Sequence, residues 1–78
     1  MIKNRKIAKL ITTRILECGA RLDETTALVK RECSADEFDA FKKVAGRIMG
    51  EMLLEVLAPI FKQHPDLKPN RLRKMTSA

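Results

Sequence analysis

The sequence has few of the residues on which most catalytic and metal sites depend. Its 78 residues include no Trp or Tyr, two Cys, one His and three Gly. Cys18 and Cys33 are too few for a disulfide framework and lack the paired spacing of a zinc site, so we expect two small buried side chains. His64 has no neighbouring cysteine or second histidine with which to bind a metal. The sequence therefore predicts neither a metal nor a cofactor.

Catalytic motifs and long apolar runs are also missing. The glycines do not form a phosphate-binding loop, and no serine or cysteine is spaced to work with a base and an orienting acid. Basic residues interrupt residues 1–16, so these do not resemble a secretory signal. No stretch approaches the roughly 20 apolar residues of a membrane span. We expect a cytoplasmic protein that is not an enzyme.

Apolar residues recur at helical spacing near the start of the chain, at Ile7, Ile11, Ile15, Cys18 and Leu22. This pattern predicts a first helix from about residue 3 to residue 18 or 21, with Gly19 at its end or in its last turn. Asp23 is a suitable N-cap for a short second helix that ends near Glu32.

A third, longer helix has the clearest start signal. Ser34 followed three residues later by Glu37 fits a capping box, so we expect a helix from about residue 35 toward Gln63. Pro59 lacks an amide hydrogen and predicts a kink, and Pro65 ends the helix at the residue before it. We therefore predict an all-α domain of three helices over residues 1–64, followed by a basic, mobile tail over residues 65–78.

The third helix carries two apolar lines. The first is typical of a core stripe and consists of Phe38, Phe41, Ala45, Ile48, Met49, Met52 and Val56. The second is turned by roughly 100° and consists of Gly46, Gly50, Leu53, Leu57 and Ile60. Because a small monomer cannot cover both lines, we predict that the second is the interface of a homodimer in which paired helices approach at the glycines. The alternative is that a folded-back tail covers it.

The net charge of +6 is unevenly distributed along the chain. Residues 1–22 carry six basic and one acidic side chain, whereas residues 23–41 carry six acidic and two basic ones. One interpretation is that the acidic segment packs beside the basic first helix. Another is that both basic ends contact a polyanion through Lys3, Arg5, Lys6, Lys9, Arg71, Arg73 and Lys74.

The charge pattern argues against sequence-specific DNA recognition. Residues 27–44 have the spacing of a helix-turn-helix, but the helix that would read the DNA opens with acidic residues. No aromatic residue is interleaved with the basic ones to stack on bases. We therefore predict a small helical interaction or assembly protein that acts as a homodimer and binds another protein. Non-specific nucleic-acid binding through the basic termini is the alternative.

Overall fold

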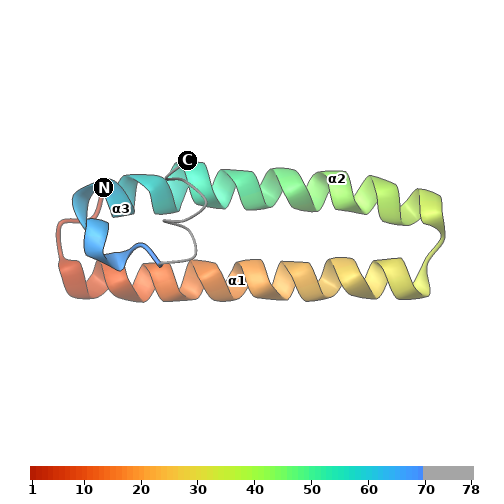
Figure 1. Ribbon diagram of the computed structural model, residues 1–78, viewed down its shortest axis with the longest axis horizontal. Helices are drawn as coiled ribbons and strands as arrows, with labels where there is room; N and C mark the ends of the chain where they lie inside the picture. The colour runs from red at the N-terminus through yellow and green to blue at the C-terminus, as the bar shows by residue number, and fades with distance from the viewer. Residues whose placement is uncertain (70–78) are drawn as a thin grey trace.

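The structure is a computed structural model that describes residues 1–69 of the chain. Two long antiparallel helices lie side by side and form a hairpin (Figure 1). The first is α1 (Arg5–Glu32), and the second runs through α2 (Ala35–Glu51), η1 (Met52–Leu57) and α3 (Ala58–Gln63). A 3₁₀ turn, η2 (Pro65–Leu67), follows, and residues 1–69 contain no strand. The fold is all-α as predicted, with two long helices in place of three.

The predicted helix boundary between Gly19 and Asp23 is wrong, because α1 continues through both residues. Gly19 is buried, and a Cβ atom added to it would lie 3.4 Å from the side chain of Met49. No described glycine has a positive φ, so Gly19 is not a left-handed cap. Its missing side chain lets the second helix approach, and packing between the helices holds α1 together at a residue that disfavours helix.

The turn between the helices begins the second helix as predicted. The Ser34 hydroxyl accepts a hydrogen bond from the Glu37 amide at 3.1 Å, and the Glu37 carboxylate accepts one from the Ser34 amide at 3.1 Å. Two hydrogen bonds lower the pKa of Glu37: the larger effect comes from the Ser34 backbone amide and the smaller one from the Ser34 side chain. This capping box confirms the predicted start of the second helix.

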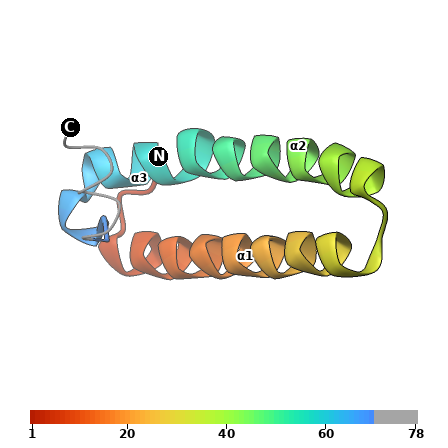
Figure 2. The same ribbon diagram turned by 45° about the vertical axis from the view of Figure 1, so that its right-hand side comes forward.

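The second helix changes its hydrogen-bond register just before Pro59. Its η1 segment is a π-helix, in which the amide of Ala58 donates to the carbonyl of Leu53, five residues back. The helix then continues through the proline to Gln63 and ends at His64 (Figure 2). The predicted continuation of the helix through Pro59 is confirmed. The π turn lies directly before this proline, which lacks an amide hydrogen.

The buried core lies at one end of the hairpin, which we call the closed end because the N-terminal segment, α3 and η2 meet there (Figure 1). Ile60 is the largest fully buried side chain. The cluster consists of Ala8, Leu57, Ile60 and Phe61, with Ile2, Ile11, Ile15, Val56 and Leu67 packed against it. The opposite end, which we call the turn end, holds Cys33 and Ser34.

Away from the closed end, the predicted core is only partly covered. Ala45 is buried as predicted, but Ile48 is exposed, and both Cys18 and Cys33 are exposed where we expected buried thiols. The physical reason is the missing third helix, because two helices cover only one side of each other.

The predicted boundary at residue 64 separates parts that pack together. Residues 65–67 form η2, and Leu67 packs against the core cluster. The imidazole Nε2 of His64 lies 2.8 Å from the carbonyl oxygen of Ile2, which connects the two ends of the described chain. The remainder of the predicted mobile tail, residues 70–78, lies outside the described residues.

Candidate interaction surfaces

The five residues that we predicted as a dimer interface are divided by the π turn. Leu57 is 3% exposed and Ile60 is 0% exposed, and both belong to the core cluster of their own chain. The π turn accommodates one residue more than an α turn, so it rotates the following residues by about 100° relative to α2. The second apolar line of the sequence therefore joins the first inside the hairpin at the closed end.

The other three residues of this line stay at the surface of the described chain. Gly46 and Leu53 are exposed, and Gly50 is half-buried. Among residues 1–69, a Cβ atom added to Gly46 or Gly50 would meet nothing within 4 Å. A larger side chain at Gly50 therefore tests contact with another molecule and not packing within the chain.

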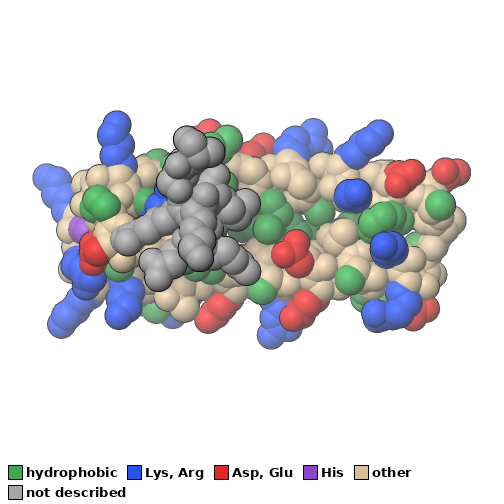
Figure 3. All heavy atoms as spheres, viewed as in Figure 1, with side chains coloured by type: hydrophobic (Ala, Val, Ile, Leu, Met, Phe, Trp, Pro, Cys, Tyr) green, Lys and Arg blue, Asp and Glu red, His purple; other side chains and the backbone are tan. Residues whose placement is uncertain are grey.

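The hairpin has two broad faces, and contacts across it show which side chains share a face. The ammonium groups of Lys30 in α1 and Lys42 in α2 each lie 5.8 Å from the centroid of the Phe38 ring. These residues mark one broad face, which we call the lysine face. Figure 3 shows Lys and Arg side chains beside a hydrophobic patch near the turn end. At helical spacing the lysine face also holds Leu16, Met49 and Leu53.

The opposite face follows from the same geometry. Each helix has two sides next to the side that contacts the other helix. Lys30 and Phe38 lie on the sides of α1 and α2 that form the lysine face, so the opposite sides of the two helices form the second face. We call it the apolar face. At helical spacing its apolar side chains are Ile7, Ile11, Cys18 and Leu28 from α1 and Phe41, Val44 and Ile48 from α2. Charged side chains share two of these rows: Arg14 and Arg21 lie between Ile7 and Leu28, and Glu37 and Glu51 lie one heptad before and after Val44.

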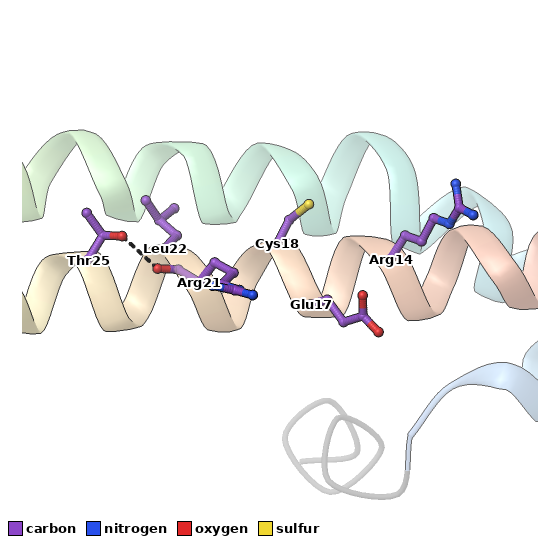
Figure 4. A pocket seen from close by; sticks show the side chains of 6 residues that line it. All are labelled: Arg14, Glu17, Cys18, Arg21, Leu22 and Thr25. Carbon is purple, nitrogen blue, oxygen red and sulfur yellow. Dashed lines mark hydrogen bonds between the residues drawn. The ribbon is translucent and has the colours of Figure 1, made fainter.

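A shallow depression of about 620 Å³ lies on α1 beside this face. Cys18 and Leu22 point from α1 toward the second helix, Glu17 points away from it, and Arg21 lies along α1 (Figure 4). The depression is lined by Arg14, Glu17, Cys18, Arg21, Leu22 and Thr25. It therefore has an apolar floor with charged side chains at its rim.

The fold separates charge between the two ends of the hairpin. The segment 23–41 folds back on itself at the turn and lies beside Lys42 and Lys43, so the interpretation that it packs beside the basic start of α1 is wrong. The basic residues before residue 10 lie at the closed end instead, where Figure 3 shows Lys and Arg side chains gathered. Residues 23–44, which form the turn end, carry six acidic and four basic side chains, so the hairpin is a rod with a strongly basic closed end and a weakly acidic turn end.

The predicted polyanion-binding residues are only partly brought together. Lys3, Lys6 and Lys9 are exposed near the closed end, whereas the Arg5 guanidinium forms an ion pair with Asp66. The hydrogen bonds from Arg5 are the main cause that lowers the pKa of Asp66. The other predicted contacts, Arg71, Arg73 and Lys74, lie outside the described residues.

The described part of the chain holds neither a metal-binding cluster nor a helix that could span a membrane. Within residues 1–69, no group of three or more His, Cys, Asp or Glu side chains is placed to hold a metal ion. In the same part of the chain, no helix has the length and apolar character needed to cross a membrane. Comparison with known proteins finds no matching family model, curated protein or solved structure.

Proposed function

We propose that this chain is a small non-enzymatic interaction protein that works as a homodimer, in which two hairpins form a four-helix bundle. The observation that supports the proposal is the number of large apolar side chains that the hairpin leaves exposed. Those more than one-third exposed are Met1, Ile7, Leu10, Leu16, Leu28, Val44, Ile48, Leu53 and Leu54.

A two-helix hairpin cannot enclose the apolar stripes that this sequence provides. Each helix presents a stripe wide enough for two neighbours, but inside one chain it has only one neighbour. The elongated shape reflects this, since the radius of gyration is 14.6 Å, against about 11.5 Å for a compact domain of this length. A second hairpin supplies the missing neighbours, and four helices surround a shared core.

Sedimentation equilibrium at micromolar concentration under reducing conditions tests the proposal. We expect the mass of a dimer, together with a melting temperature that rises with protein concentration, because association stabilises the folded state by mass action. A monomer mass with a melting temperature independent of concentration would refute the proposal.

A second candidate function is non-specific binding of nucleic acid at the basic closed end. The observation that favours it is that Lys3, Lys6 and Lys9 are exposed near one end of the rod. Affinity for a random DNA duplex should then fall steeply with salt, because each phosphate contact releases counterions. Binding that is absent at low salt, or insensitive to salt, would exclude this candidate.

A further inference from the structure

We infer that the second copy packs on the apolar face, that the two hairpins run in opposite directions, and that Cys18 lies close to Cys18 of the second copy. This inference rests on the proposed homodimer and adds the contact face and the direction of packing. Neither can be taken from the predicted glycine seam, because the π turn divides its residues between the core and the surface.

The apolar face exposes more large hydrophobic side chains than the lysine face. Ile7, Leu28, Val44 and Ile48 are each 42–46% exposed on it. On the lysine face, the exposed large hydrophobic side chains are Leu16 and Leu53, and two ammonium groups lie over Phe38. Covering the apolar face therefore removes more large hydrophobic side chains from water than covering the lysine face.

The size of the apolar face is sufficient for a stable dimer. The hairpin measures 44 × 28 × 18 Å, and its shortest axis is perpendicular to the two broad faces (Figure 1). Each broad face therefore has a projected area on the order of 1,200 Å². A standard protein interface buries about 800 Å² on each partner, which is less than this area. Overlap along most of the helix length meets this requirement.

The charge distribution selects the direction in which the hairpins run. Packing in the same direction would place the acidic turn end of one copy beside the acidic turn end of the other, and the basic closed ends together. Packing in opposite directions places each acidic turn end beside a basic closed end, which replaces repulsion with attraction. Opposite directions also suit a self-complementary contact that stops at two copies.

The middle of α1 supplies the centre of this contact. Cys18 is near the midpoint of α1 (Arg5–Glu32), so it lies near its symmetry equivalent when two copies of α1 cross in opposite directions on the apolar face. Arg21 of one copy is then within about one helical turn of Glu17 of the other, because each residue advances the helix by about 1.5 Å. The rim charges of the depression are therefore complementary between copies.

Two single-cysteine variants test the arrangement. Cys33→Ser leaves Cys18 as the only thiol, and Cys18→Ser leaves Cys33 as the only one; each is treated with a short bismaleimide crosslinker at micromolar concentration. We expect rapid crosslinking of the Cys18-only chain into a covalent dimer. The Cys33-only chain should not crosslink, because its thiols are about 45 Å apart at a rise of 1.5 Å per residue.

A matched control measures crosslinking by random collision. The variant Thr13→Cys in a chain without the other two cysteines places an exposed thiol on the outer side of α1, and its rate is the background. Sedimentation equilibrium of each reduced variant is measured in parallel.

The possible outcomes separate the inference from the proposed function. A dimer whose Cys18-only form crosslinks well above the background, and whose Cys33-only form does not, supports the inference. A dimer in which Cys33 crosslinks instead shows packing in the same direction and overturns it. A dimer in which neither thiol crosslinks above the background overturns the apolar face as the contact. A reduced monomer refutes the proposed function itself.

Discussion

At the residue scale, ionic and hydrogen-bonded contacts bring the two ends of the described chain together. Arg5 pairs with Asp66, the terminal amine of Met1 donates to Gln63 Oε1 at 2.6 Å, and His64 approaches the carbonyl of Ile2. These contacts are largely exposed, so their effect on the free energy of unfolding is modest. The pKa of Asp66 is the property that reports these contacts most directly.

The pKa of Asp66 should lie below its usual value of 3.8 because the Arg5 guanidinium stabilises the carboxylate. A pKa lowered by folding gives stability that is present above the pKa of the unfolded chain and is lost as the pH falls through the folded pKa. Arg5→Gln should therefore raise the pKa of Asp66 toward its usual value, measured by NMR titration of the carboxyl carbon.

Glu37 provides the matched control for this titration. Its pKa is lowered first by the Ser34 backbone amide and next by the Ser34 side chain, so it should be unchanged in Arg5→Gln. In Ser34→Ala it should rise only in part, because the backbone amide is kept. A similar movement of both carboxyl groups in either variant would indicate global unfolding instead of loss of one partner.

At the element scale, the π turn determines which side chains enter the core. The segment η1 rotates the end of the second helix, and this rotation directs Leu57, Ile60 and Phe61 toward α1. If the π turn accommodates one extra residue, removing one residue from it should restore an α turn. The core residues that follow should then keep their positions facing α1.

We therefore expect deletion of Leu54 to be tolerated, because this side chain is 68% exposed and lies within η1. Its effect on the free energy of unfolding should stay close to the ~0.5 kcal/mol typical of a surface change. Deletion of Lys43 is the control, since it is also exposed but lies in regular α2. It should rotate every later residue by about 100° and cost at least the ~2–5 kcal/mol of removing a large core side chain. Urea unfolding followed by circular dichroism measures both, and equal effects would contradict this role of the π turn.

At the scale of the whole molecule, the proposed dimer makes the hairpin one half of a bundle, and one charged side chain in the contact should separate the two copies. Val44 is on the apolar face and is 44% exposed, so a carboxylate at this position is solvated in the monomer and buried in the dimer.

Val44→Glu should therefore weaken dimerisation by at least tenfold, which corresponds to about 1.4 kcal/mol, without unfolding the chain. Leu54→Glu is the matched control, because Leu54 is more exposed and lies outside the apolar face. Sedimentation equilibrium measures the dissociation constants, and circular dichroism checks that both variants retain their helices. If Leu54→Glu weakened the dimer more than Val44→Glu, the contact would lie on another side of the second helix.

The local signals in the sequence predicted the parts of this fold that depend on a few neighbouring residues. The capping box at Ser34 and the helix end before Pro65 are interactions within one helical turn, and their outcome does not depend on distant contacts. The all-α class follows from apolar spacing alone. The excess of apolar residues along the second helix also indicates the exposed apolar surface behind the proposed dimer. Leu57 and Ile60, which we predicted at the interface, lie in the core of the chain.

The tertiary structure decided what depends on the approach of one helix to the other. Gly19 is a helix terminator by its local preference, but contact with the side chain of Met49 keeps it inside α1. Leu57 and Ile60 follow a separate line at 100° per residue, and a change of hydrogen-bond register in η1 brings them into the core. A fixed helical period cannot describe a helix whose period changes along its length, because the register is selected by the burial that it allows between helices.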